Sequence, residues 1–272
     1  MPHRRPCCGW AGACGACFVD HASLAESDDP RRRHYLAALG IEQWLPRGLP
    51  AAPAAAAVSA APAVAAAAPT EVDLAWQQLA DEVARCTRCE LHRTRTRPVL
   101  GVGDRRAQWL VVGEAPGAEE DRQGEPFVGR AGQLLDAMLR AIGLARGRNV
   151  YIANILKSRP PGNRDPAPVE VAACLPYLER QIELLRPRLI LAVGRIAMQN
   201  LLDTQSSLGR MRGQVHAFGG LKTPVIVTYH PAYLLRNQAL SEKRKVWEDM
   251  LMVLERLGRT ITEKQQSYFL PK

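Results

Sequence analysis

Four short runs of consecutive apolar residues recur between residues 109 and 230, and segments with helical spacing separate them. The runs are WLVVG (109–113), VYIAN (150–154), LILAVG (189–194) and VIVTYH (225–230). Amphipathic helical patterns lie at 133–143, 169–185 and 246–258. Continuous apolar strands that alternate with helices are typical of a parallel sheet covered on both faces. We therefore predict an α/β domain, a three-layer α/β/α sandwich with a central parallel sheet of about four strands.

The segments before the first strand differ in composition. Residues 71–85 favour a helix whose inward face carries Val72, Trp76, Leu79 and Val83. Residues 51–70 contain 13 Ala and 3 Pro, a composition that favours a mobile linker over a rigid rod. The chain thus divides into an N-terminal extension (1–50) with one short amphipathic helix, a linker (51–70) and a working domain (71–272).

Composition narrows the class of protein. Hydrophobic residues make up 47% of the chain, which excludes a purely disordered protein, and no run of about 18 apolar residues occurs outside the Ala/Pro-rich segment. The net charge is +9, and residues 71–272 carry 30 of the 36 basic and 22 of the 27 acidic side chains. This excess suits either a phosphate backbone as partner or ordinary solubility.

The cysteines indicate the compartment. Their number, seven, is odd, which argues against the disulfide framework of a secreted domain. The N-terminus resembles an export signal in its Arg4-Arg5 pair, but glycines break the apolar run and Asp20 ends it. We expect a reducing, cytoplasmic location.

Each predicted strand is followed by chemically distinctive residues. These are Glu114, Asn154, the Gly194-Arg195 pair and His230. Turn chemistry alone explains Gly and Pro at such positions. Because ligands of parallel α/β sheets bind at the carboxyl ends of the strands, the four ends together predict a binding site.

The loop after the first strand, GEAPGAEEDRQGEPFVGRAG (113–132), is rich in carboxylates. Such a cluster is often only solvated. Phe127 in this loop either anchors the loop or offers a stacking surface to a planar ligand.

The second and fourth strand ends carry polar side chains suited to a base. The Asn154 amide both accepts and donates, so it matches a pyrimidine edge, although an Asn here also suits a turn. Lys157, Arg159 and Arg164 follow in a Pro/Gly loop and suit phosphates or solvent. His230 is either structural or a donor to an oxygen that gains charge.

Taken in order, the motifs GEAPG, PFVGRAG, IAN, RPPGNR and HPAYLLR resemble the iron–sulfur-containing family 4 uracil-DNA glycosylases over about residues 75–260. The resemblance implies a DNA repair enzyme of base excision repair that flips uracil out of DNA and hydrolyses its N-glycosidic bond, leaving an abasic site. Phe127 would stack on uracil, Asn154 would read its Watson–Crick edge, and His230 would stabilise the leaving anion at O2.

Contacts with DNA are predicted from the residues themselves. Leu234 and Leu235 either cap the core or act as a wedge in DNA, and we expect Leu234 to fill the gap left by the flipped base. The expected phosphate contacts are Lys157, Arg159, Arg164 and Arg236. Further roles depend on how this chain departs from the resembled superfamily. The general superfamily type has Asp where this chain has Ala115 and Tyr where it has Gly117. Glu114 is therefore the candidate that orients water, and Glu120 the candidate that crowds the C5 position of the base.

The set of cysteines that match the family pattern is incomplete. The family holds a [4Fe–4S] cluster with four cysteines, and Cys86, Cys89 and Cys174 match three of them, whereas Ser158 occupies the third position. Alternatives are zinc with His92 or water as the fourth ligand, a thiolate from the N-terminal extension (Cys7, Cys8, Cys14 or Cys17), and no metal.

Three classes of function are distinguishable. An enzyme that excises uracil needs both Asn154 and His230, and both are present. A non-catalytic module that binds uracil or DNA would keep the pocket without turnover. An electron-transfer protein has no need of these loops. The expected partner is uracil-containing DNA, single- or double-stranded, bound by a monomer with no membrane association and located with the nucleoid.

Overall fold

The computed structural model describes residues 70–269. The predicted N-terminal extension, nearly all of the linker, and Cys7, Cys8, Cys14 and Cys17 lie outside the described residues. The described residues therefore cover the predicted working domain except for its last three residues.

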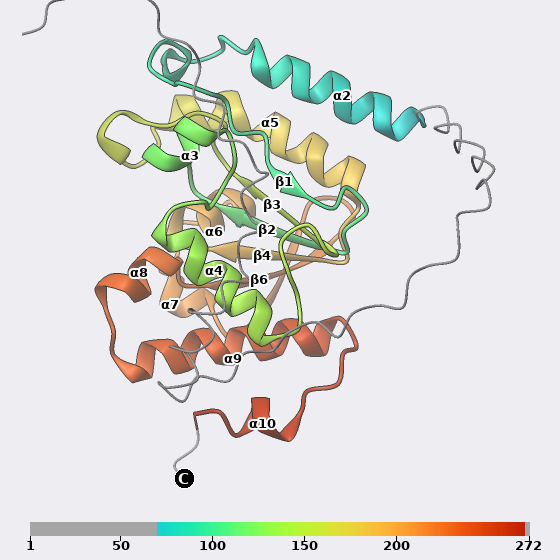
Figure 1. Cartoon of the computed structure of the whole chain (residues 1–272), viewed down its shortest axis with the longest axis vertical. Helices are drawn as coiled ribbons and strands as arrows, with labels where there is room; N and C mark the ends of the chain where they lie inside the picture. The colour runs from blue at the N-terminus through green and yellow to red at the C-terminus, as the bar shows by residue number, and fades with distance from the viewer. Residues whose placement is uncertain (1–69, 270–272) are drawn as a thin grey trace, which may run out of the picture. The chain divides into compact units, whose positions relative to one another are not determined.

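The strands form one six-stranded sheet in the order β1-β3-β2-β4-β6-β5. Figure 1 labels β1, β3, β2, β4 and β6, which follow one another in this order. They are β1 (Val102–Gly103), β2 (Trp109–Gly113), β3 (Val150–Asn154), β4 (Leu189–Val193), β5 (Val215–Phe218) and β6 (Thr223–Thr228). The four central strands, β3, β2, β4 and β6, are parallel, and the two edge strands pair antiparallel. The predicted α/β class and its parallel sheet are confirmed. The predicted strand count was too low by the two edge strands, because β1 is very short and β5 is only half-buried, so neither produces a continuous apolar run.

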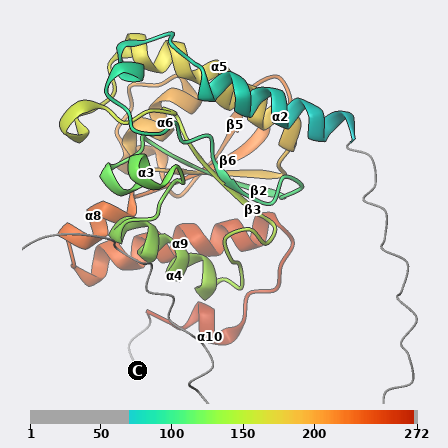
Figure 2. The same ribbon diagram turned by 45° about the horizontal axis from the view of Figure 1, so that its top comes forward.

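Helices cover both faces of this sheet. The longer ones are α2 (Glu71–Ala84), α4 (Arg130–Ala141), α5 (Pro168–Leu185), α6 (Arg195–Leu202) and α9 (Leu240–Arg256). The shorter ones are α3 (Ala118–Gln123), α7 (Leu208–Met211), α8 (Pro231–Arg236), α10 (Glu263–Gln266) and the 3-10 turns η2 (Glu90–Arg93) and η3 (Pro161–Asn163). Figure 2 shows α2 and α5 on one side of the sheet and α4 and α9 on the other.

The core forms two layers because side chains alternate along each strand. In β2, Leu110 and Val112 pack toward α2, α5 and α6, whereas Trp109 and Val111 pack toward α4, α8 and α9. Every residue of β2, β3 and β4 is buried. Strands buried on both faces are continuous apolar segments, which is why their sequence pattern shows no alternation.

The first helix of the domain differs from its prediction at one residue. Thr70 caps the N-terminus of α2, and Trp76, Leu79 and Val83 face inward as expected. Val72, however, is 49% exposed. It lies in the first turn of the helix, so it precedes the part of α2 that packs on α5.

None of the helices between residues 70 and 269 is long and apolar enough to span a membrane.

Candidate active site

A cavity of about 430 Å³ lies at the carboxyl ends of β2, β3 and β6. Seven of the side chains or backbone positions singled out from the sequence line it: Glu114, Gly117, Glu120, Phe127, Asn154, His230 and Arg236. They come from three segments, 114–127, 154 and 230–236, that are at least 27 residues apart in the chain. The register that pairs Gly113 with Asn154 brings the first two of these segments side by side.

Asn154 ends β3 and is 2% exposed. Its Oδ1 has no hydrogen-bond partner among residues 70–269. A buried acceptor without a partner costs about 1–3 kcal/mol, a cost that a ligand N–H would remove. The side chain is therefore suited to a ligand that donates from inside the cavity.

Gly113, beside Asn154, leaves room for two functional side chains. A Cβ at this position would lie 2.5 Å from Asn154 Oδ1 and 2.5 Å from Phe127 Cζ. Such distances are shorter than any van der Waals contact, so only glycine permits both side chains to reach the cavity wall.

Phe127 is 6% exposed, and its ring stacks on that of His230 with a centroid separation of 5.5 Å and an interplanar angle of 28°. Its φ of 56° is in the left-handed region, which costs a non-glycine residue about 1–2 kcal/mol. This conformation persists because the surrounding chain holds the loop on both sides.

The carboxylate of Glu120 holds the loop after Phe127. One oxygen accepts from the backbone N–H groups of Val128 and Gly129, both at 3.0 Å, and the other accepts from Gly117 at 3.1 Å. The sequence suggested that Glu120 crowds the base. Its carboxylate lines the cavity but is engaged with three backbone donors, so its direct action in this structure is to hold the Phe127 loop.

Arg146 holds the loop before and at Phe127. Its guanidinium donates to the carbonyls of Pro126 (2.8 Å) and Phe127 (2.7 Å) and pairs with Asp136 at 3.1 Å. Arg146 was not among the site residues predicted from the sequence. It lies about twenty positions away in an ordinary surface turn, and no local motif marks it.

His230 is the N-cap of α8, and its Nδ1 accepts from the backbone N–H of Ala232 at 3.1 Å. The neutral ring therefore carries its proton on Nε2, which is left as a donor. Burial lowers the pKa of His230 to about 4, and the nearby Arg236 charge adds to this effect. The imidazole is thus neutral near pH 7.

Glu114 follows β2 at the cavity wall. Burial raises its pKa above the usual range, the negative charge of Asp165 raises it further, and Arg195 opposes both. Asp165 and Arg195 form an ion pair at 2.5 Å, and Asp165 also lines the cavity. Arg195 was named from the sequence only as a strand-end residue, and Asp165 was not singled out, since the pair joins a loop after β3 to the start of α6.

The basic residues of the loop after β3 do not all face solvent. Lys157 is 2% exposed, and its ammonium donates to Asn154 O and to Gln181 Oε1, which corrects the prediction that it contacts phosphate. Arg164 is exposed but bound by both oxygens of Glu170, so its charge is already paired. Arg159 bonds Asn163 at 2.7 Å, and Arg236 is exposed at the cavity wall.

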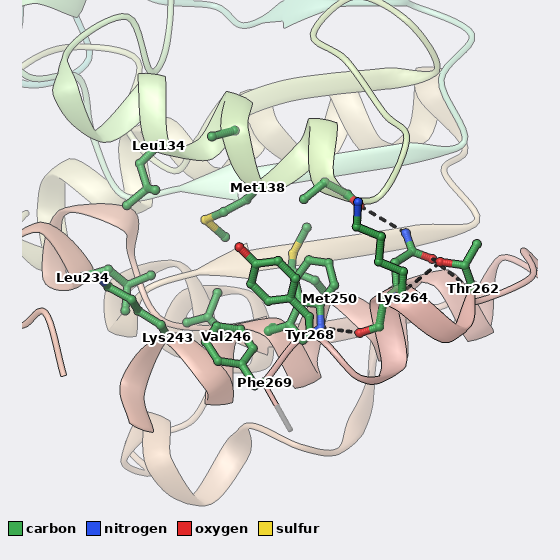
Figure 3. A pocket seen from close by; sticks show the side chains of 14 residues that line it. Leu134, Met138, Leu234, Lys243, Val246, Met250, Thr262, Lys264, Tyr268 and Phe269 are labelled. Atoms are coloured by element: carbon green, nitrogen blue, oxygen red, sulfur yellow. Dashed lines mark hydrogen bonds between the residues drawn. The ribbon is translucent and has the colours of Figure 1, made fainter. Parts of the chain in front are cut away.

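Leu234 also differs from its prediction. It is 5% exposed and lines an apolar cavity of about 550 Å³ between α4, α9 and α10, where Figure 3 shows it among Leu134, Met138 and Val246. This placement corrects the prediction that Leu234 projects toward DNA, because the side chain packs in the core. Leu235, its neighbour in the same helix, is the more exposed of the two.

The candidate metal ligands gather near the start of α5. Cys86 and Cys89 pack against the core cluster that contains Cys174, and burial raises the pKa of the Cys174 thiol. Ser158 is buried and accepts a hydrogen bond from Arg95 at 3.1 Å. His92 Nδ1 contacts the carbonyl of Cys89.

These residues fall short of a complete cluster site. Among residues 70–269 no three His, Cys, Asp or Glu side chains are arranged to hold a metal ion. The described chain offers three thiols and one hydroxyl that already accepts from a guanidinium, whereas a [4Fe–4S] cluster takes four thiolates.

The chain matches known proteins over the domain that holds this cavity. The family model of the uracil DNA glycosylase superfamily matches residues 100–251. A type-4 uracil-DNA glycosylase of Archaeoglobus fulgidus is 44% identical over 194 residues, which cover 69% of this chain and 94% of that protein. A type-4 uracil-DNA glycosylase of Thermotoga maritima is 45% identical over 174 residues, 63% of this chain and 89% of that protein. A type-5 uracil-DNA glycosylase of Thermus thermophilus is 38% identical over 120 residues, 39% of this chain and 54% of that protein. With a superfamily model over more than half of its length and type-4 relatives matched over nearly their whole length, the chain belongs to the type-4 uracil-DNA glycosylases.

Proposed function

We propose that the cavity at the strand ends receives a uracil base flipped out of DNA and that the side chains lining it break its bond to the sugar. The activity of the family is hydrolysis of the N-glycosidic bond of uracil in DNA, the first step of base excision repair. The observation that carries the assignment of the site is the unpartnered, buried Oδ1 of Asn154, in a cavity that also presents Phe127 and His230.

Asn154 accounts for recognition of the base. Its Oδ1 accepts from the uracil N3–H, and its Nδ2 donates to O4. Cytosine has no hydrogen on N3 and carries an amino group at C4. Its N3 acceptor would therefore face the Oδ1 acceptor of Asn154, and its amino donor would face the Nδ2 donor. The aromatic ring of Phe127 offers a stacking face to the base.

His230 accounts for departure of the base. When the C1′–N1 bond breaks, its electron pair moves onto N1 and spreads to O2. The Nε2–H of a neutral imidazole donates to O2 as that charge develops, which stabilises the transition state more than the ground state. No proton has to leave His230, because uracil departs as an anion.

Glu114 accounts for addition of water. Its carboxylate orients a water molecule toward C1′ of the oxocarbenium-like sugar and accepts the proton released when the new C1′–O bond forms. Its negative charge also stabilises the sugar cation. Asp165 lies at the same wall, with its charge paired by Arg195.

The remaining assignments concern partner and location. Arg159 and Arg236 are our proposed phosphate contacts. Arg236 is exposed at the cavity wall, and the partly exposed Arg159 donates to Asn163, which also lines the cavity. We propose that the protein acts as a monomer in the cytoplasm, associated with the nucleoid, on single- or double-stranded uracil-containing DNA.

The cofactor assignment is also a proposal. A [4Fe–4S] cluster would be held by Cys86, Cys89 and Cys174, with Ser158 or solvent as a weaker fourth ligand, and would tie the end of α2 to α5. It would supply structural support, and the chemistry described above uses only side chains of the cavity.

Paired substitutions test the site. We expect Asn154→Asp to lose uracil excision, because a carboxylate cannot donate to O4, and to gain activity on cytosine. We expect His230→Ala to slow excision by about 10²–10³-fold. The measurement is single-turnover cleavage of uracil-containing and matched thymine-containing oligonucleotides, with alkali to cleave abasic sites.

Two results would reject parts of this proposal. Near-normal rates in both variants would show that the cavity is not the reaction site. Tight binding of uracil-containing DNA by the unsubstituted protein without any abasic product would favour the non-catalytic binding module.

A further inference from the structure

A buried ammonium group lies directly behind Asn154, and the proposed chemistry gives it no part. Lys157 is 2% exposed, and its side chain folds back over the end of β3 so that Nζ donates to the Asn154 carbonyl at 2.8 Å. Removing an ammonium from water is costly unless it is well hydrogen-bonded. Lys157 and the Asn154 carbonyl therefore constrain each other's position.

Gln181, on α5, holds this ammonium from the other side. It is fully buried, and its Oε1 accepts from Lys157 Nζ at 2.6 Å. Its Nε2 donates to the Leu100 carbonyl at 2.9 Å and to the Tyr151 hydroxyl at 3.2 Å. Because both ends of the amide are engaged, Gln181 cannot rotate without losing a buried hydrogen bond.

The side chain of Asn154 depends on its backbone for its position. Its Oδ1 has no partner in the described part of the chain that would orient the amide. The backbone next to it is held on one side by β2, through Ile155 N to Gly113 O at 3.0 Å. On the other side the Asn154 carbonyl is held by Lys157.

We propose that Lys157, held by Gln181, is a positioning residue that sets the Asn154 amide for recognition of the base. This inference rests on the proposed function of Asn154 and deepens it. Lys157 acts through Asn154 and does not touch the base. Misplacement of a recognition group by about 1 Å costs up to about 10²-fold in rate, which is the scale of effect that loss of this support produces.

A double-mutant cycle separates positioning from general support. We expect Lys157→Met to lower the rate constant of uracil excision, measured under single-turnover conditions, about 10–100-fold. In an Asn154→Ala background the same substitution should change the rate by no more than about twofold, because the group that Lys157 positions is gone. Lys264→Met, on the exposed α10, is the matched control and should leave the rate unchanged.

The outcomes divide clearly. Equal effects of Lys157→Met in both backgrounds, or no effect in either, would overturn the inference and leave the role of Asn154 intact. Undiminished excision by Asn154→Ala would overturn the proposed function itself. Circular dichroism and the thermal midpoint report whether each variant folds. If Lys157→Met does not fold, Gln181→Met replaces it in the cycle, since it removes the acceptor that holds the ammonium, and additive effects there would count against the inference.

Discussion

The protonation state of one side chain, His230, decides which interaction the cavity offers to a group that becomes negatively charged. Its Nδ1 accepts from Ala232, and its surroundings disfavour the cation, so a neutral donor faces the cavity. A neutral imidazole donates this hydrogen bond without changing its protonation state. A general acid, in contrast, must lose and regain a proton near neutral pH. The low pKa of His230 also makes the stability of the fold depend on pH.

We expect His230 to leave a signature in the pH dependence of folding. Its pKa is about 4 in the folded protein against 6.5 as the ordinary value, so as pH falls below 6.5 the unfolded chain takes up the proton first. The contribution to stability is fully present above pH 6.5 and is lost toward pH 4, by about 3 kcal/mol at most. Denaturant unfolding of the protein and of His230→Gln, from pH 7 to pH 4, measures this.

The gap in unfolding free energy between the two proteins should move in favour of His230→Gln as pH falls. His216→Gln, on β5 away from the cavity, controls for loss of a histidine. A gap that stays constant across this range would show that His230 titrates alike in folded and unfolded chains. We also expect the rate of uracil excision to show no decrease with a midpoint near pH 6.5 that is due to protonation of His230.

At the scale of elements, the loop between α3 and α4 is held open as a wall of the cavity. Glu120, from α3, accepts from the amides after Phe127, and Arg146, from the turn before β3, donates to the carbonyls before and at Phe127. Gly132 allows α4 to begin close by, since a Cβ there would overlap the Phe127 carbonyl. The positive φ of Phe127 is thus imposed by contacts from two separate elements.

We expect Arg146→Met to release this loop. Two hydrogen bonds from a charged donor are lost, each worth about 1.5–3 kcal/mol, and Phe127 can then relax from its left-handed conformation. Uracil excision should fall by about tenfold or more, with a lower thermal midpoint. Single-turnover kinetics and thermal unfolding measure the two effects.

Arg148→Met, an exposed arginine of the same turn, is the control and should behave as the unsubstituted protein. Equal excision rates for Arg146→Met and Arg148→Met would show that Glu120 and packing alone hold the Phe127 loop.

At the scale of the whole molecule, the cysteine region connects the start of the domain to its sheet. Cys86 and Cys89 follow α2, Ser158 follows β3, and Cys174 is on α5, so a metal bound there would join three elements. Any group that binds only the folded state adds its binding free energy to stability. The hydroxyl of Ser158, which accepts from Arg95, is the weak point of this set.

We expect Ser158→Cys to strengthen metal binding. A fourth thiolate completes the donor set, so protein purified without oxygen should contain more iron and sulfide per chain, absorb more strongly in the thiolate-to-iron region, bleach more slowly in air and unfold at a higher temperature. Metal analysis, absorption spectra and thermal unfolding test this, with Cys174→Ser as the variant expected to reverse each change. Iron-free, colourless protein in all forms, with full excision, would show that packing alone supports the loop after β3.

Local sequence patterns were enough to predict the centre of the sheet, four of the longer helices (α2, α4, α5 and α9) and the residues near the site. Buried parallel strands must be continuous apolar runs, and their carboxyl ends must meet at one edge, so Glu114, Asn154 and His230 could be placed together from local patterns alone. The edge strand β5 escaped this reasoning, because its four residues, VHAF, form neither a continuous buried run nor a regular alternation of buried and exposed positions.

The direction of the long side chains, and the groups that they bind, depend on the folded chain. Lys157 and Arg159 stand two positions apart in one basic loop, yet one ammonium is buried against Asn154 and Gln181 while the neighbouring guanidinium lies at the surface. Leu234 likewise packs into the core rather than toward DNA. Arg146 reaches a loop about twenty residues away. Local spacing specifies backbone conformation and the burial of whole segments, but the partner of a long polar side chain depends on groups that come close only when the chain is folded.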